Sequence, residues 1–317
     1  MRGFILSGGT ATEIGFAEAA AQFGKAQFVW LHLDGRMDDA QAWLKSQSDI
    51  PEIARGALLA SETRPRSDTI GHGALVNLRA LGVTPEDDPD PLVSIRFWAE
   101  TGRAISLSYR SPLALEPLIS QFLSGEIADG GDLVSEVAVE ITEQLDPYIA
   151  AMGDTLDDIE VGIESERLPA LRRKVNHVRS RAISYRRFVS PQRTALERLA
   201  TEPCNWLDED DRLHLRDAAD RFARMAEELE SIRERAAIVH DELTDLRAEQ
   251  LDSRGLVIAI VAFVFLPLTF LTGLLGMNVE GIPYAKEAWA FWGVVGVCLL
   301  VGMGVIGYFV RRRWLER

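Results

Sequence analysis

Residues 255–276 have the sequence GLVIAIVAFVFLPLTFLTGLLG, and this run without an ionisable side chain decides the fold. A helix rises about 1.5 Å per residue, so about 22 residues cross a hydrocarbon core of about 30 Å. Residues 288–310 form a second uncharged run, which stops at Arg311-Arg312-Arg313. A buried core helix or a signal sequence is the alternative, but the length of both runs and their distance from the N-terminus favour membrane spans. The sequence therefore predicts two C-terminal transmembrane helices.

Basic residues are distributed unevenly around the two spans. Arg254 precedes the first span and the basic tail 311–317 follows the second, whereas the connection between the spans contains a single basic residue, Lys286. Because basic residues concentrate on the cytoplasmic side of membrane proteins, we expect both termini in the cytoplasm and the spans in the inner membrane. Residues 1–15 show no export signal, so the residues before the first span are expected to be cytosolic.

Residues 1–131 mix short apolar runs with helical patterns. Runs rich in β-branched and aromatic residues predict strands at 27–33, 74–78, 92–98 and 104–109, the last two joined as a hairpin. Helical spacing and start signals predict helices at 38–47, 51–60 and 113–123. The turn-forming cluster Asp129-Gly130-Gly131-Asp132 ends the region. We therefore predict a small cytosolic α/β domain over residues 1–131.

Residues 132–254 have helical patterns only, and their charges are segregated. Residues 132–166 contain eleven acidic side chains and no Lys or Arg, whereas residues 167–198 contain ten basic side chains and the single acid Glu197. We expect two long helices folded into a hairpin at Leu168-Pro169-Ala170, with opposite charges favouring the pairing. Such charge blocks are usually solvated faces. The alternative is regulatory, with the acids attracting or binding divalent cations in the cytosol.

From Asp208 onward, nothing interrupts the helical pattern before the first span. Asp208 has the chemistry of an N-cap, and a helix unbroken to Gly276 would contain about 69 residues and extend on the order of 100 Å. Two spans from one chain cannot enclose a passage, because both would be largely exposed to lipid. Any transport function therefore requires several copies of this helix around one axis.

Residues 266–278, LPLTFLTGLLGMN, resemble the pore-helix end and the signature tripeptide of the CorA superfamily. The tripeptide is Gly276-Met277-Asn278, which closes the first of the two C-terminal spans. Further segments resemble the ZntB branch of that superfamily: 30–33 (WLHL), 62–66 (ETRPR), 190–193 (SPQR) and 281–283 (GIP). The resemblance implies an α+β cytosolic domain, a long-helix funnel and two transmembrane helices, assembled as a CorA-like homopentamer.

The resemblance also implies how the chain is divided. Its parts would be the cytosolic α/β domain 1–131, the long-helix funnel or stalk 132–254, the pore-lining transmembrane helix 255–276, the extracytoplasmic loop 277–287, the second transmembrane helix 288–310 and the basic cytosolic tail 311–317. The residues that would line the pore are Thr269, Leu266, Ala262, Ile258 and Gly255. Their spacing of three or four keeps them on one side of a helix, as packing residues would also be. The same side continues into the cytosol through Leu251, Ala248, Thr244 and Asp241.

Asn278 would recognise a hydrated divalent cation, with a ring of amide oxygens hydrogen-bonded to the ion's water shell. Gly276 would let the backbone turn and expose carbonyl oxygens at the helix end. An Asn at a helix end is also a common cap, which is the structural alternative. Glu280 and Glu287 would concentrate cations at the outer mouth, unless they are ordinary surface acids, and Asp241 would form a cytosolic ring of carboxylates with a role in metal binding.

The transported metal implied by the ZntB resemblance is Zn²⁺, but the ligand chemistry of the chain does not itself indicate zinc. The five histidines are scattered, with no pair at ligand spacing and no neighbouring Cys. Glu280 also stands where ZntB-like sequences commonly carry Gly, which keeps Mg²⁺ and Co²⁺ as alternatives. Neither span contains a charged residue or His, so a water-lined conduit with inward flux down the membrane potential fits better than a carboxylate relay.

Rings of Leu266 and Ile258 would form an apolar gate, unless these residues only pack the bundle. A membrane-anchored sensor or scaffold is the alternative function from another class. We expect no enzymatic activity and no bound cofactor, because no nucleophile, base and oxyanion-donor grouping is present. A net charge of -14 disfavours nucleic acid as a partner. The expected partners are other copies of the chain, the lipid bilayer and the divalent cations.

Overall fold

The computed structural model describes residues 1–61, 64–83, 91–163, 168–277, 282, 284 and 287–315. The chain divides into two compact units, Met1–His240 and Asp241–Arg317. The first unit contains a sheet with helices on both faces, and the second contains the C-terminal part of one long helix followed by the last helix. We describe each unit separately.

The first unit is built on a seven-stranded mixed sheet with strand order β2-β1-β3-β7-β6-β5-β4. Its strands are β1 (Arg2–Ser7), β2 (Thr10–Ile14), β3 (Phe28–Asp34), β4 (Arg66–Ile70), β5 (Gly73–Leu81), β6 (Leu92–Glu100) and β7 (Arg103–Ser108). Strands β3 and β7 pair in parallel, and the other neighbours pair antiparallel. The four strands predicted from the sequence are present as β3, β5, β6 and β7, and the β6–β7 hairpin is confirmed.

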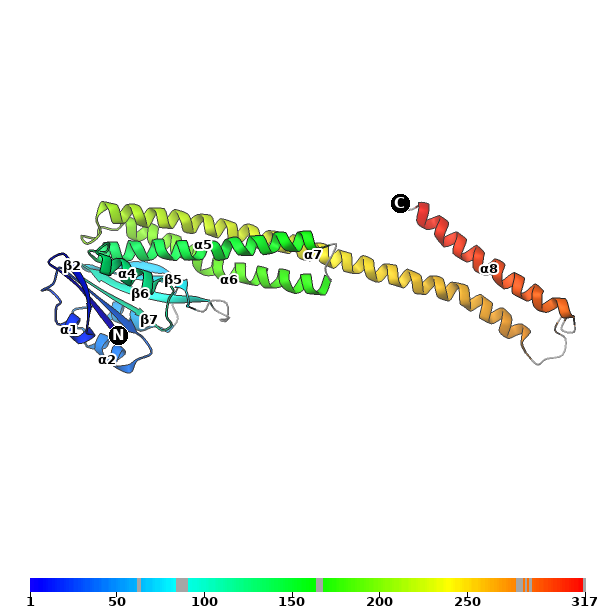
Figure 1. The fold of residues 1–317 in the computed structure, drawn as a ribbon, viewed down its shortest axis with the longest axis horizontal. Helices are drawn as coiled ribbons and strands as arrows, with labels where there is room; N and C mark the ends of the chain where they lie inside the picture. Colours follow the sequence, from blue (N-terminus) through cyan, green and yellow to red (C-terminus); the bar gives the residue numbers. More distant parts are fainter. Residues whose placement is uncertain are drawn as a thin grey trace. The chain divides into compact units, whose positions relative to one another are not determined.

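Helices cover both faces of the sheet (Figure 1). One face packs against α1 (Phe16–Ala20), α2 (Asp38–Ser46) and α3 (Glu52–Leu59), and the other against α4 (Leu115–Ser124) and the long helices. Strand β3 shows why its sequence is continuously apolar: Phe28 and Trp30 join the core beneath the long helices, whereas Val29 and Leu31 join the core beneath α1 to α3. Alternate side chains are therefore buried on opposite faces.

The long helices are α5 (Gly130–Gly162), α6 (Leu168–Thr201) and α7 (Glu209–Leu275), and α8 (Ala288–Leu315) follows. The predicted helical hairpin is present as α5 and α6, which lie side by side in Figure 1. Acids of α5 form ion pairs with α7: Glu143 with Arg221 at 3.5 Å, and Asp157 and Glu160 with Arg235. The acidic block of α5 is therefore matched by arginines of α7 as well as facing the basic helix predicted as its partner.

Three strands and one helix were not anticipated by the sequence patterns. Strands β2 (TATEI) and β4 (RSDTI) are the two edges of the sheet and carry polar residues that face solvent, so neither has a continuous apolar signal. Helix α1 has only five residues. Edge position explains the missing signal of β2 and β4, and short length explains that of α1. Strand β1 has six residues, as many as the predicted β7, and its apolar run was simply not selected.

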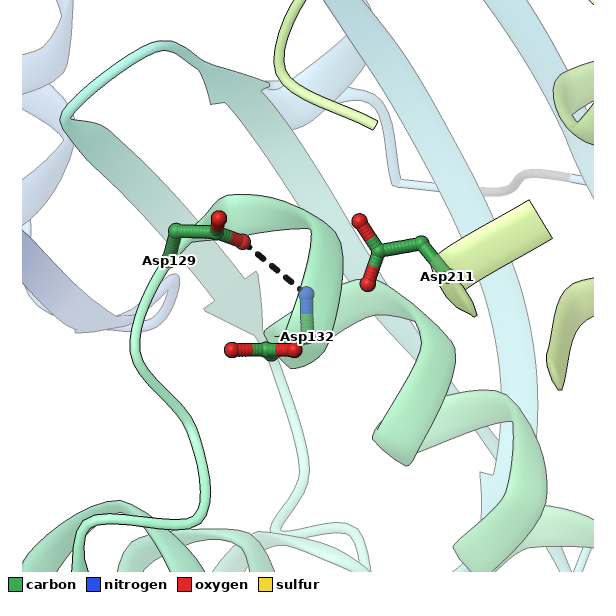
Figure 2. A group of neighbouring side chains, drawn as sticks. All are labelled: Asp129, Asp132 and Asp211. Atoms are coloured by element: carbon green, nitrogen blue, oxygen red, sulfur yellow. Dashed lines mark hydrogen bonds between the residues drawn. The ribbon is translucent and has the colours of Figure 1, made fainter. Parts of the chain in front are cut away.

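Two helix N-termini meet in the first unit, and aspartates cap both of them (Figure 2). Asp129 accepts hydrogen bonds from the backbone N–H groups of Gly131 and Asp132, while the Asp132 carboxylate accepts one from Ala128 at 2.8 Å. At α7, Asp208 accepts from the backbone of Asp211 and the Asp211 carboxylate accepts from that of Asp208, each at 2.9 Å. The pair at α7 is a reciprocal capping box and confirms Asp208 as the N-cap. At α5 the N-cap is Asp129, and the Asp132 carboxylate bonds instead to the residue before the N-cap.

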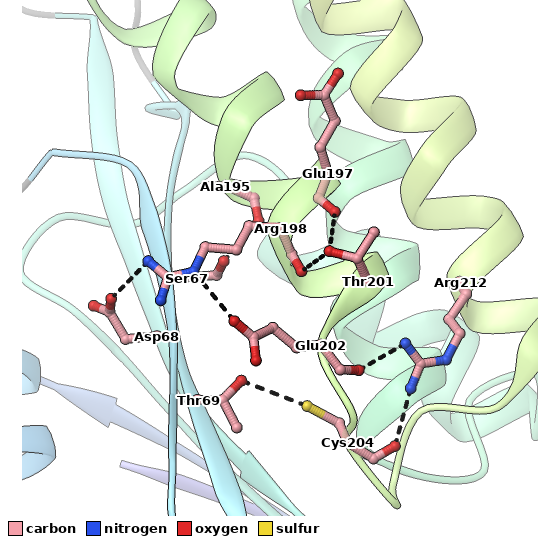
Figure 3. A network of polar contacts seen from close by, with 10 residues as sticks. All are labelled: Ser67, Asp68, Thr69, Ala195, Glu197, Arg198, Thr201, Glu202, Cys204 and Arg212. Atoms are coloured by element: carbon pink, nitrogen blue, oxygen red, sulfur yellow. Dashed lines mark hydrogen bonds and ion pairs between the residues drawn. The ribbon is translucent and has the colours of Figure 1, made fainter.

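The end of α6 and the turn that follows it contact the edge strand β4 through polar groups (Figure 3). The Ser67 hydroxyl donates to the carbonyl of Ala195 at 2.7 Å, and Arg198 forms an ion pair with Asp68 at 3.4 Å. Arg212 donates to the carbonyls of Ala200, Glu202 and Cys204. These carbonyls lie in the last turn of α6 and just beyond its end, where no further helical turn can satisfy them. Arg212 therefore joins the end of α6 to the start of α7.

Candidate ion pathway

Helix α7 continues without a break from the first unit through the whole first apolar run and ends at Leu275. The unbroken helix predicted from the sequence is confirmed, and its length is 67 residues. The chain contains two helices that are long and apolar enough to cross a membrane, the C-terminal part of α7 and residues Ala288–Phe309 of α8. Their length and composition are those expected of two spans.

Pro267 and Thr272 give the end of α7 its local geometry. Pro267 lies inside the helix and has no N–H to donate to the carbonyl four residues earlier, so the hydrogen-bond ladder is interrupted there. The Thr272 hydroxyl donates to the carbonyl of Leu268 at 2.9 Å. The Gly276 N–H donates to the carbonyl of Thr272 at 2.9 Å, and a Cβ at Gly276 would lie 3.0 Å from that oxygen. A glycine therefore suits this position because of the close backbone approach.

The five residues predicted to line the pore all lie on an exposed side of α7. Ile258 and Leu266 are 70% and 75% exposed, and Gly255, Ala262 and Thr269 are exposed as well. The partly covered residues of the same stretch are Ile260, Val264, Leu268, Leu271 and Leu275. Because successive residues turn by about 100° around a helix, these two sets occupy opposite sides.

A ring contact marks where the two helices of the second unit meet. Phe263 of α7 and Phe309 of α8 pack edge to face, with their ring centroids 6.3 Å apart. The predicted pore-lining side is turned away from the partly covered side of α7. An apolar surface that its own chain leaves uncovered can be buried only by lipid or by other copies of the chain.

The predicted cytosolic continuation is exposed too. Asp241, Thr244, Ala248 and Leu251 are exposed on α7, whereas their neighbour Leu243 is fully buried. Asp241 therefore lies at a position that several copies of α7 could bring together. Its role in metal binding stays a prediction.

The predicted outer mouth is described only in part. Met277 is 48% exposed just beyond the end of α7, while Asn278 and Glu280 lie outside the described residues. Glu287 directly precedes α8, its backbone carbonyl accepting from the N–H of Ala290 at 3.1 Å. A carboxylate at this place also interacts favourably with the positive end of the helix dipole and so stabilises the helix. The sequence interpretation did not consider this structural role.

The structure brings together three carboxylates that the sequence interpretation did not select: Asp129, Asp132 and Asp211 (Figure 2). One oxygen from each lies within 4.8 Å of the others, as in groups that hold metal ions. Burial raises the pKa of Asp211 to about 7, and the negative charges of Asp129, Asp208 and Asp132 contribute in the same direction. Their capping hydrogen bonds account for all three side chains. The Asp-x-x-Asp spacing at both helix starts was the available sequence signal.

The histidines remain dispersed in the structure. His32 is buried in the sheet, where its Nδ1 lies 2.8 Å from the Ser106 hydroxyl, and burial lowers its pKa to about 4. His72 pairs with Glu100 and His214 with Asp210. Among the described residues, the one group of three or more potential metal-ligating side chains is the aspartate cluster, and it contains no His or Cys.

Comparison with known proteins decides the family. The family model described as CorA-like Mg²⁺ transporter protein matches residues 25–313, which is most of the chain. The chain belongs to this family. The "Zinc transport protein ZntB" of Klebsiella pneumoniae is 33% identical over 289 residues, covering 90% of this chain and 88% of the relative. The protein of the same name from Yersinia enterocolitica is 30% identical over 290 residues, covering 91% of this chain and 88% of the relative.

Solved structures agree with the family assignment. The full-length CmaX protein is 31% identical, with a TM-score of 0.80 over 99% of this chain and 98% of its own. The CorA magnesium transporter of Methanocaldococcus jannaschii has a TM-score of 0.81 over 98% of this chain and 97% of its own; at 16% identity it shows the fold alone. The predicted fold class, an α+β domain with long helices and two C-terminal transmembrane helices, is confirmed. The chain is a membrane protein of a family of divalent-cation transporters.

Proposed function

We propose that this CorA-family protein transports Zn²⁺ through a central passage formed by five copies of α7. The exposed side of α7 that carries Ile258 and Leu266 is the observation that supports this most directly. It lies opposite the partly covered side of the same helix, so it is available to other copies of the chain. Pentameric assembly rests on the family resemblance, and the relatives named as zinc transport proteins favour zinc as the metal.

The passage would be lined by ordinary side chains rather than by charged groups. Thr269 contributes a hydroxyl near its outer end, and Ala262 and Gly255 leave room for water around the ion. Leu266 and Ile258 would form two apolar rings that block hydrated ions by dewetting when the passage is narrow. Since neither span contains Asp, Glu, His, Lys or Arg, the ion would pass with most of its water shell.

Recognition would take place at the outer end, where Asn278 follows Gly276 and Met277. Five amide oxygens can accept hydrogen bonds from the waters around a divalent cation without displacing them. Glu280 and Glu287 would raise the local cation concentration, and Asp241 would receive the ion at the cytosolic end. Entry into the cytoplasm is favoured by about 2.3 kcal/mol per charge per 100 mV of membrane potential, so we propose inward flux.

The dispersed histidines bear on the choice of metal. Zinc sites in proteins use His and Cys, and His32 is committed to the sheet, where it contacts Ser106 and Ser108. Zinc preference would therefore come from recognition of the hydrated ion or from coupling to another gradient rather than from direct soft ligands. Mg²⁺ or Co²⁺ transport is the alternative, and the family description names Mg²⁺.

The test is metal-resolved uptake into vesicles containing the purified protein and a metal-sensitive dye, with and without a pH gradient. We expect Zn²⁺ uptake, and we expect Asn278→Ala to reduce it at least tenfold while leaving the assembly intact. Glu249→Gln, on the exposed cytosolic part of α7, is the matched control and should leave uptake unchanged. Uptake of Mg²⁺ or Co²⁺ without Zn²⁺ would select the alternative metals. No uptake of any of the three by the unmodified protein would favour a membrane-anchored sensor or scaffold.

A further inference from the structure

The outward side of α6 carries a row of arginines that the chain leaves open. Arg173 and Arg187 are exposed and Arg172 is half-buried beside them, opposite the side of α6 that packs into the core. We call these three residues the basic stripe. Arg186 turns towards α7 instead and pairs with Glu230 at 3.0 Å. Within the part of the chain that the structure describes, the basic stripe has no acidic partner, so its charge is available to a surface outside the chain.

The outward side of α5 carries acids that are open in the same way. Asp154 and Asp158 are exposed one helical turn apart, opposite the buried side of α5, and we call these two residues the acidic stripe. Their neighbours Asp157 and Glu160 pair with Arg235 of α7. No basic residue that the structure describes pairs with the acidic stripe, and α5 itself contains no Lys or Arg. One chain thus presents two unpaired faces of opposite charge.

Exposed apolar side chains accompany both stripes. Ile183 is 48% exposed on α6 between Arg173 and Arg187, and Val161 is 84% exposed just beyond the acidic stripe. Pro147 is exposed on the same side of α5 as the acidic stripe. A single exposed apolar residue is ordinary on a protein surface, but apolar residues within a charged row are typical of interfaces, where a polar rim surrounds an apolar centre.

The two stripes lie at matching distances along the helical hairpin. Asp158 and Arg172 are each four residues from the hairpin end of their helix, or about 6 Å. Pro147 and Ile183 are each fifteen residues from it, or about 22 Å. A rotation about an axis parallel to the helices leaves the height of every residue unchanged. In a ring of copies, the acids of one α5 would therefore face the arginines of the next α6, and Pro147 would face Ile183.

We propose that the acidic stripe of each copy docks on the basic stripe of the next copy around the axis. This contact is heterologous, so it repeats from copy to copy until the ring closes. A second copy is favoured over an anionic lipid surface, because such a surface would attract the basic stripe and repel the acidic stripe at the same height. The inference rests on the proposed assembly around one axis and names the cytosolic surfaces that hold it together.

The test is disulfide cross-linking of the full-length protein in detergent, with Asp158→Cys and Arg173→Cys on copies that carry different tags. After co-assembly, we expect at least tenfold more cross-linked product joining the two tags than product joining two copies of one variant. The unmodified protein measures the background from its own cysteines, the buried Cys204 and the half-buried Cys298. Both substituted positions are exposed, so the fold is kept.

Arg187→Cys is the matched control for the alignment of the two helices. It belongs to the same basic stripe as Arg173 but lies about 21 Å further along α6. In mixtures with Asp158→Cys, it should give at least tenfold less cross-linked product than Arg173→Cys does. Equal cross-linking by Arg173→Cys and Arg187→Cys would contradict the predicted heights and overturn the proposal.

Charge reversal tests the electrostatic part of the contact. Asp154→Arg with Asp158→Arg, and separately Arg172→Glu with Arg173→Glu, should each lower the assembled share of the diluted protein at least threefold, because like charges then face each other. Mixing the two variants should restore assembly, since each reversed stripe can meet the opposite reversed stripe. Asp39→Arg, on the exposed side of α2 across the sheet from the long helices, should assemble as the unmodified protein does.

The interface and the transport function can fail separately. The interface is overturned if protein that takes up metal forms no product joining the Asp158→Cys and Arg173→Cys tags, or if each variant joins mainly to itself. It is also overturned if Arg172→Glu with Arg173→Glu assembles normally but loses binding to vesicles of anionic lipid, which would assign the basic stripe to the membrane. Cross-linking between the two tags without uptake of any metal would support the interface and count against transport alone.

Discussion

The two units of the chain place the same kind of apolar side chain in opposite environments. Leu229, on α7 in the first unit, is fully buried, whereas Leu300, on α8 in the second unit, is 68% exposed. The first unit removes its apolar surface from water with its own sheet and helices. The second can do so only with lipid or with other copies of the chain. The difference shows which unit folds by its own packing and which depends on its surroundings.

The largest predicted effect is a difference in stability between leucine substitutions in the two units. Leu229→Ala should destabilise the first unit by about 2–5 kcal/mol, since it leaves a cavity in a packed core. Leu300→Ala should change stability by less than about 1 kcal/mol, because a lipid-facing leucine exchanges one apolar environment for another. Denaturant unfolding of the full chain in detergent measures the stability change in both variants. Hydrogen exchange of the sheet amides then reports on the first unit. Equal losses of stability at the two positions would contradict this difference between the two units.

A second prediction concerns Asp211, a carboxyl group that is buried in the first unit. Because the pKa of Asp211 is raised to about 7 in the folded chain from its usual value of 3.8, the folded state holds a proton that the unfolded state releases between these values. This contribution to stability is present below about pH 4 and is lost as the pH rises towards 7, by up to about 4 kcal/mol. Asp211→Asn should flatten this dependence, since its amide oxygen can still accept the backbone N–H of Asp208.

Chemical unfolding between pH 4 and pH 8 measures the Asp211 effect. Asp210→Asn is the control, because the neighbouring Asp210 side chain is 76% exposed and takes no part in the capping box. We expect the stability of the control to follow that of the unmodified protein across the pH range. The same slope in Asp211→Asn would mean that a different group releases the proton.

The smallest predicted effect is a difference in cation flux between substitutions of two isoleucines on opposite sides of α7. Ile258→Ala should raise basal cation flux several-fold, equivalent to about 1 kcal/mol in the barrier, if an apolar ring narrows the passage there. Ile260→Ala removes the same atoms from the partly covered side and should leave the flux unchanged. Cation uptake into dye-loaded vesicles measures the flux through both variants. An increase in both variants would indicate a general loosening of the bundle instead of a gate.

Patterns that depend on many consecutive residues predicted much of the fold. The two uncharged runs, the hairpin of α5 and α6, and the unbroken α7 each have a long signal, so these helices are present, although α8 continues to Leu315, beyond the expected end at residue 310. Short edge strands such as β2 and β4 have no such signal, because one side of each faces solvent. The pairing of α5 acids with Arg221 and Arg235 of α7 was also missed, since charge segregation does not identify which helix packs opposite.

The functional residues were predictable to different degrees. The side of α7 that carries Ile258 and Leu266 follows from helical spacing, but its role stays a prediction because it depends on other copies of the chain. A cavity in the first unit is lined by Arg64, Arg79, Arg96, Arg110 and Arg187. It could not be found from the sequence, because only the sheet and α6 bring these five residues together. Long-range convergence of this kind leaves no local pattern.

The proline within α7 has a mechanical consequence. Pro267 removes the hydrogen bond to the carbonyl of Phe263, one turn earlier, and it lies between Leu266 and Thr269, where an apolar ring and a hydroxyl ring would be adjacent. Bending a helix at such a point requires less energy than bending it elsewhere, so α7 would act as a lever with its hinge near the outer end. A small tilt about this hinge would widen or close the passage at Leu266 while the remaining helix stays straight.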